Sequence, residues 1–212
     1  GGAGNNVFYI DSTGGTFTGG ADDDTFEVQP GSWVNTINTG DGRNSVALSA
    51  YVEGINGGSG SDRVSVAESV SAYRLTAYLG GGDDSVISYG QYNYAELSMG
   101  DGDDTIEMHG GARNSWDSYW EYYDLGNGND RLLIAGEYGN HQPQVYGGNG
   151  ADVIDLSGTT GGRWQVWGGT GNDTITASGS GNNTIWGEDG DDQMIGAGNA
   201  DSMQGGAGAD VF

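Results

Sequence analysis

The sequence predicts an all-β fold, a right-handed parallel β-roll or β-solenoid of about ten coils. A glycine-rich phrase, typified by GGNGADVID from Gly147 to Asp155, returns along almost the whole chain. The spacing of the phrases fits half or whole coils of such a roll, and three columns of apolar residues keep the same register.

The composition excludes several classes of partner. The 212 residues include 44 glycines and carry a formal charge of −24, which without periodicity would indicate disorder. The glycines are periodic, however, so we expect a fold that is completed by cations. There is no Lys and the six Arg are scattered, which argues against nucleic acid as a partner. No apolar run reaches the roughly 18 residues of a membrane span, so membrane insertion is not expected.

The sixth position of each phrase holds Asp or Asn, and its spacing predicts the coil. Successive positions lie 18 to 26 residues apart up to Asp173 and 9 or 10 apart afterwards. A half coil takes about nine residues, so the long steps place the phrases on one edge and the short steps use both edges. The main ladder contains Asn6, Asp24, Asn44, Asp62, Asp84, Asp104, Asp130, Asp152, Asp173, Asp192 and Asp210, and the second ladder contains Asn183 and Asp201.

This spacing also predicts how the chain is organised. We expect a single β-roll domain over residues 1–212, as a fragment of a longer chain. Residues 1–177 carry phrases on one edge opposite an irregular edge, and residues 178–212 carry regular phrases on both edges.

Three apolar columns predict the strands and the core. Two and four residues after each ladder position the side chains are mostly apolar, which is the period of one strand face. A third column, seven residues before each position, supplies the facing strand. The first column is Phe8, Phe26, Val46, Val64, Val86, Ile106, Leu132, Ile154, Ile175, Met194 and Phe212, and the third is Phe17, Ile37, Ile55, Ala77, Leu97, Tyr123, Val145, Val166, Ile185 and Met203.

The phrase Gly-Gly-x-Gly-x-Asp-x-apolar-x resembles the calcium-binding nonapeptide of the RTX (repeats-in-toxin) family. The resemblance implies Ca²⁺ between successive loops of one edge, held by backbone carbonyls and sixth-position carboxylates. We expect about seven to ten ions, with weaker sites where Asn replaces Asp, because an amide carries no charge. The implied ligands are Asp24, Asp62, Asp84, Asp104, Asp130, Asp152, Asp173, Asp192, Asp201 and Asp210, and the weaker ones are Asn6, Asn44 and Asn183.

The resemblance implies a calcium-binding structural segment of a secreted or cell-surface bacterial protein, such as an adhesin, surface-layer or filament component. Type I secretion would export the chain, and calcium would fold it outside the cell. The alternative is a carrier or secretion module of a secreted carbohydrate-active enzyme or protease. We do not expect this segment to be an enzyme, because His109 and His141 lack an obvious catalytic partner and are predicted at the surface.

Aromatic residues mark a possible partner surface. The longest ladder step, from Asp104 to Asp130, adds residues on the irregular edge. Exposed aromatics there could bind a glycan or neighbouring subunits of a surface assembly, or could simply cover the open side of the coil. The candidate patch is Trp116, Tyr119, Trp120 and Tyr122, while Trp164, Trp167 and Trp186 are expected along an exposed sheet face.

Overall fold

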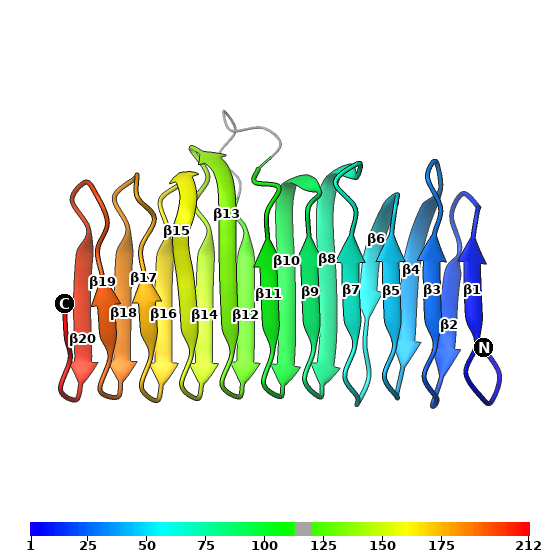
Figure 1. Ribbon diagram of the computed structural model, residues 1–212, viewed down its shortest axis with the longest axis horizontal. Helices are drawn as coiled ribbons and strands as arrows, with labels where there is room; N and C mark the ends of the chain where they lie inside the picture. Colours follow the sequence, from blue (N-terminus) through cyan, green and yellow to red (C-terminus); the bar gives the residue numbers. More distant parts are fainter. Residues whose placement is uncertain (113–119) are drawn as a thin grey trace.

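The computed structural model describes residues 1–112 and 120–212, and these form a two-sheet parallel solenoid. Figure 1 shows the coils side by side in an elongated rod, with the two termini at opposite ends. Each coil gives one strand to each of two 10-stranded sheets, and neighbouring strands in a sheet run parallel. The described residues form no helix. The predicted all-β solenoid of about ten coils is therefore confirmed.

The first sheet contains the odd-numbered strands, most of them four residues long. They follow the ladder loops, so each begins just after a sixth-position residue. The strands are β1 (Val7–Ile10), β3 (Thr25–Val28), β5 (Ser45–Leu48), β7 (Arg63–Val66), β9 (Ser85–Ser88), β11 (Thr105–Met108), β13 (Arg131–Gly139), β15 (Val153–Gly161), β17 (Thr174–Thr176) and β19 (Gln193–Ile195).

The second sheet contains the even-numbered strands, which run into the ladder loops and vary more in length. They are β2 (Thr16–Gly20), β4 (Trp33–Gly40), β6 (Tyr51–Asn56), β8 (Ser71–Gly81), β10 (Gln91–Asp101), β12 (Tyr122–Asn127), β14 (Gln144–Asn149), β16 (Gln165–Thr170), β18 (Thr184–Asp189) and β20 (Ser202–Ala207).

The strand register places the predicted columns in line. In the first sheet Phe26 pairs with Phe8 on one side and Val46 on the other, and the column continues to Met194. In the second sheet the column runs from Phe17 to Met203 in the same way. The interior members of both columns are buried, so side chains of one kind stack coil on coil along a thin core.

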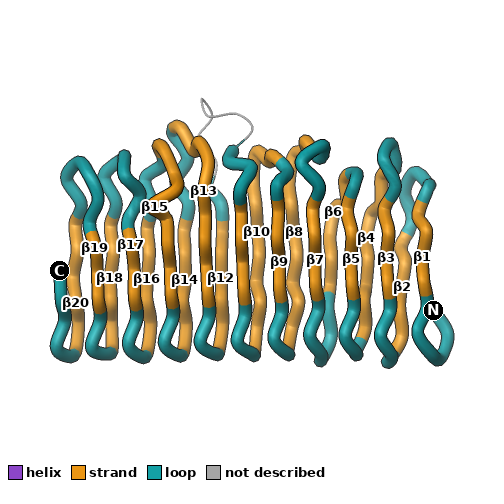
Figure 2. Tube along the Cα trace, in the orientation of Figure 1, coloured by secondary structure: helices purple, strands orange, loops and turns teal. Residues whose placement is uncertain are grey.

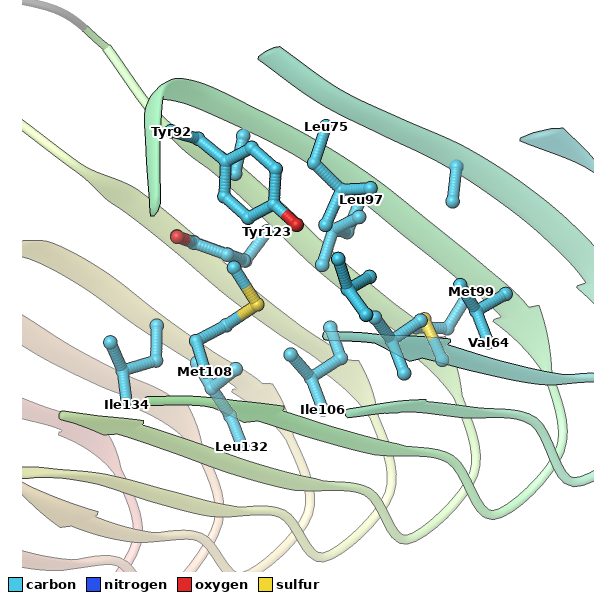
Figure 3. Close-up of a cluster of buried hydrophobic side chains, with 14 of the residues drawn as sticks. Val64, Leu75, Tyr92, Leu97, Met99, Ile106, Met108, Tyr123, Leu132 and Ile134 are labelled. Atoms are coloured by element: carbon cyan, nitrogen blue, oxygen red, sulfur yellow. The ribbon is translucent and has the colours of Figure 1, made fainter. Parts of the chain in front are cut away.

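The core widens in the middle of the rod. Figure 3 shows Ile106 and Leu132 of the first sheet packed toward Leu97 and Tyr123 of the second, with Tyr92 above them. Strands β8 and β10 are both 11 residues long and carry extra inward side chains toward the irregular edge. This extension lies outside the three predicted columns.

The two edges of the rod differ. Figure 2 shows uniform turns along the edge where the even strands end, and connections of varied height along the other. The uniform turns bring backbones into contact: a Cβ on Gly148, where φ is +105°, would collide with the Gly126 carbonyl of the preceding loop. Glycine at this position is therefore required by both backbone angle and space.

Candidate metal centre

The side chains of the main ladder lie inside the uniform edge. Asn44 is buried with the aspartates of the inner loops, whereas Asn6 and Asp210 are partly buried. On the opposite edge Asn183 is buried and Asp201 is partly buried. The aspartates with at most 2% exposure are Asp24, Asp62, Asp84, Asp104, Asp130, Asp152, Asp173 and Asp192.

One oxygen of each ladder carboxylate ties two loops together. The Asp84 N–H donates to Asp104 Oδ1 at 2.7 Å, and the Asp104 N–H donates to Asp130 Oδ1 at 2.7 Å. The same bond, from a backbone N–H to the ladder side chain of the following loop, continues without interruption from Asn6 to Asp210. On the opposite edge the Asn183 N–H donates to Asp201 Oδ1 at 3.0 Å. The stack is thus held by side-chain acceptors as well as by strand pairing.

The second carboxylate oxygen lies beside backbone carbonyls. A Cβ placed on Gly147 would lie 2.6 Å from Asp152 Oδ2 and would also meet the Gly168 carbonyl of the next loop. Two oxygens from neighbouring loops therefore face one point, where each repels the other unless something positive lies between them. Among the described residues, no hydrogen-bond partner is found for the buried Oδ2 of Asp84, Asp104, Asp130, Asp152, Asp173 and Asp192.

The electrostatics of these loops follow from burial. Burial raises the pKa of Asp84, Asp104, Asp130 and Asp173 from 3.8 to about 7, and carboxylates of adjoining loops add to the rise. The pKa of Asp152 is raised to about 6 for the same reason. In the absence of a cation, the folded loops therefore disfavour their own ionised carboxylates near neutral pH.

The asparagine loops close differently. Asn44 Nδ2 donates to the carbonyls of Gly40, Asp41 and Gly42 in its own loop at 3.2–3.3 Å, and to Asp62 Oδ1 at 2.8 Å. Asn6 makes the equivalent bonds to its own loop carbonyls and to Asp24. Asn183 Nδ2 donates to Ser178 and Asp201 on the opposite edge. An amide N–H₂ thus satisfies loop carbonyls that a carboxylate cannot satisfy.

Residues at the fifth position of the phrase form a fifth-position ladder, whose hydrogen bonds run in the opposite direction along the chain. Asp83 Oδ1 accepts from the Asp103 N–H at 3.0 Å, and Asp103 Oδ1 accepts from the Asn129 N–H at 2.8 Å. Asp191 continues the pattern to the Ala209 N–H at 2.8 Å. These side chains are exposed to solvent, and each also accepts a hydrogen bond from the next loop. Loops with Asp or Asn at position five are therefore bonded backward by the sixth residue and forward by the fifth.

Comparison with known families identifies the loops. Residues 144–158, 165–180 and 178–212 match the family model of the RTX calcium-binding nonapeptide repeat, in four copies. These segments of the chain carry RTX calcium-binding repeats. Residues before 144 lie outside this match, yet the RTX-like loops at Asp84 and Asp104 show the same contacts. No curated protein and no solved structure matches the chain.

The residues present fit the calcium that RTX repeats imply. Calcium prefers six to eight oxygen ligands, and the loops offer carboxylate and carbonyl oxygens turned toward each other. No group of three His, Cys, Asp or Glu side chains that could hold a metal occurs within residues 1–112 and 120–212. Backbone carbonyls would supply most of the ligands to such an ion, and the Oδ2 atoms without a hydrogen-bond partner would supply the negative charge.

The predicted aromatic patch is only partly described. Trp116 and Tyr119 lie outside the described residues. Trp120 is 58% exposed. Tyr122 lies on β12, on the outer face of the second sheet, with its ring centroid 5.3 Å from that of Tyr146. Tyr122 therefore belongs to a row of rings along the sheet face.

Two expectations at the irregular edge are wrong. Trp164 is fully buried rather than on a sheet face, and it packs edge-on against Tyr138 with 5.0 Å between centroids. His141 is also fully buried and pairs through Nδ1 with the buried carboxylate of Glu121. Burial raises the pKa of Glu121 even though His141 lies beside it. The irregular edge thus has its own polar core.

The described residues contain no helix long and apolar enough to cross a bilayer.

Proposed function

We propose that this chain is one calcium-stabilised β-roll domain of a secreted or cell-surface protein, and that it serves as a rigid structural segment. The observation that supports this most directly is the row of buried, unpartnered Oδ2 atoms along the uniform edge. A row of buried anionic oxygens is destabilising unless cations lie among them. Calcium would therefore be a structural component of the folded domain.

The loop chemistry supports a specific occupancy. We assign the ions to gaps with aspartate on both sides, from the Asp62–Asp84 gap to the Asp192–Asp210 gap, which amounts to about seven ions. Loops centred on Asn6, Asn44 and Asn183 close through amide hydrogen bonds, so they need no ion for closure. This refines the predicted range of seven to ten toward its lower end.

A secreted location agrees with the calcium requirement. RTX repeats are typical of secreted bacterial proteins. Millimolar external calcium would stabilise the fold by mass action. Low cytosolic calcium would leave the acidic chain unfolded, which is the state that a type I secretion system exports. The elongated rod suits an adhesin, surface-layer or filament component, in which length and stiffness are the useful properties.

The first experiment measures folding against calcium. Far-UV circular dichroism and small-angle scattering are recorded in calcium-free buffer and in 5 mM CaCl₂. We expect a strand spectrum and a rod-like particle only with calcium, and reversal on adding chelator. A strand spectrum that survives excess chelator at pH 8 would refute the structural role of calcium.

A second experiment tests the surface role. Binding to bacterial glycans is compared for the wild type, Trp120→Ala and a control variant, Trp33→Ala, whose ring is also exposed. Selective loss in Trp120→Ala supports an adhesive edge. Equal binding by all three proteins indicates a scaffold without glycan recognition at Trp120.

A further inference from the structure

A cavity lies on the outer face of the second sheet, near the C-terminal end of the rod, where Figure 1 shows β18 and β20 side by side. Its volume is about 260 Å³, and it is lined by Trp186, Glu188, Asp189, Gln204 and the backbone of residues 205–207. The register pairs Trp186 with Gln204 and Glu188 with Gly206. The cavity is open because β20, in the last coil, places Gln204 beside Trp186 and Gly206 beside Glu188, where larger side chains would fill the space.

Glu188 occupies a backbone position that every other loop of the main ladder gives to glycine. Its φ is +79°, a left-handed angle that disfavours residues with a Cβ. At equivalent positions Gly169 and Gly206 have φ of +115° and +118°. The strain holds a carboxylate on the sheet face, and such local strain is commonly retained where a side chain has a function.

Trp186 ends a stack of aromatic rings. Tyr146 and Trp167 stack with centroids 4.6 Å apart, and Trp167 stacks on Trp186 at 4.8 Å. One face of the Trp186 indole is therefore covered by Trp167. On its other side the register partner is Gln204, which lines the cavity with it. The indole therefore borders the cavity at the end of the aromatic row.

The charge around the cavity has one sign. Glu188 and Asp189 are exposed and form no ion pair with any described Arg or His. An indole face and two carboxylates together attract a cation, the ring through its negative π face and the carboxylates through charge. The cavity is thus complementary to a positive group and not to a neutral or anionic one.

We propose that this cavity is a binding site for a guanidinium group. A guanidinium is planar, so it can stack on the Trp186 face while its in-plane N–H groups donate to Glu188 and Asp189. A compact ammonium can use the carboxylates but stacks less well, because it is more strongly hydrated. The bound guanidinium would belong either to a free guanidino compound or to an arginine side chain of a partner protein.

The test follows the indole N–H resonances of the calcium-saturated chain by NMR, with the Trp186 signal assigned by its loss in Trp186→Leu. Methylguanidinium is titrated at constant ionic strength beside its neutral isostere, N-methylurea, and beside methylammonium. We expect saturable shifts of the Trp186 signal with methylguanidinium, at least fivefold weaker binding of methylammonium, and no saturation with N-methylurea. An arginine-containing tripeptide separates the sources: tighter binding than methylguanidinium indicates a protein partner, and equal binding a free compound.

Substitutions at the exposed carboxylates of the cavity test the guanidinium site and should leave the fold intact. Glu188→Gly restores the usual glycine, so we expect about tenfold weaker methylguanidinium binding together with a melting temperature raised by about 2–4 °C. Asp189→Asn should also weaken binding, whereas Glu68→Gln, an exposed acid on the other edge, should not. An unmoved Trp186 signal, equal shifts with N-methylurea, or unchanged affinity in Glu188→Gly would overturn the proposal.

Discussion

Replacing Asp104 by Asn should stabilise the calcium-free fold and remove calcium binding at that loop. The pKa of Asp104 is about 7 in the folded chain against an ordinary value of 3.8. Each pKa unit corresponds to about 1.36 kcal/mol, so ionised Asp104 costs the metal-free fold ~4 kcal/mol above pH 7. An amide removes this charge and can donate to the loop carbonyls as Asn44 does. We expect a net gain of roughly 2–4 kcal/mol without calcium.

The assay is urea unfolding followed by circular dichroism at pH 8, in calcium-free buffer and in 5 mM CaCl₂, with calcium stoichiometry from calorimetry. Asp104→Asn should need less calcium to fold and should bind one or two fewer ions. The reciprocal variant, Asn44→Asp, should need more calcium and lose stability without it. If Asp104→Asn is as unfolded as the wild type in calcium-free buffer, or binds the same number of ions, the interpretation of the orphaned oxygens is wrong.

Three further predictions concern pH, loop space and the core. The pKa values of Asp84 and Asp130 are near 7 in the folded chain and 3.8 in the unfolded chain. Protonation of these carboxyls therefore stabilises the fold fully below pH 3.8, and this stabilisation is lost as the pH rises through 7. Acidifying the calcium-free chain from pH 8 to 5 should increase its strand signal in circular dichroism, and a falling signal would contradict the raised pKa values. In Gly168→Ala the new Cβ would lie 2.7 Å from the Gly187 carbonyl and against Asp173, so calcium affinity by calorimetry should drop at least tenfold, while Gly54→Ala, which meets nothing within 4 Å, should bind normally. Leu97→Ala empties a fully buried position and should lower the free energy of unfolding by about 2–5 kcal/mol with unchanged calcium stoichiometry, and a smaller loss would show that the two-sheet core is loosely packed.

The repeating part of the fold could be predicted because period and chemistry agree there. Val64 and Val166 could be placed in the core from their distance to a ladder residue alone, and both are fully buried. The column four residues after the ladder ends at Gly196, which has no side chain to bury and is exposed. Because the coils stack in parallel and in register, residues at the same distance along the chain from their ladder residues occupy the same place in every coil.

The irregular edge could not be predicted in the same way. Trp164 and His141 follow no repeated offset, and their burial depends on Tyr138 and Glu121, which come from other coils. The fifth-position ladder did leave a signal, since Asp or Asn recurs there at Asp83, Asp103 and Asn129. The signal does not reveal the hydrogen bonds, because these residues are exposed and an acidic loop residue is usually solvated.

The most direct measurement is an anomalous difference map from crystals grown in calcium. The account predicts about seven peaks along the uniform edge, each between two aspartate loops from Asp62 to Asp210, and none within the loops of Asn6 or Asn44. Gaps between aspartate loops that show no peak in saturating calcium, with the rod still intact, would contradict it.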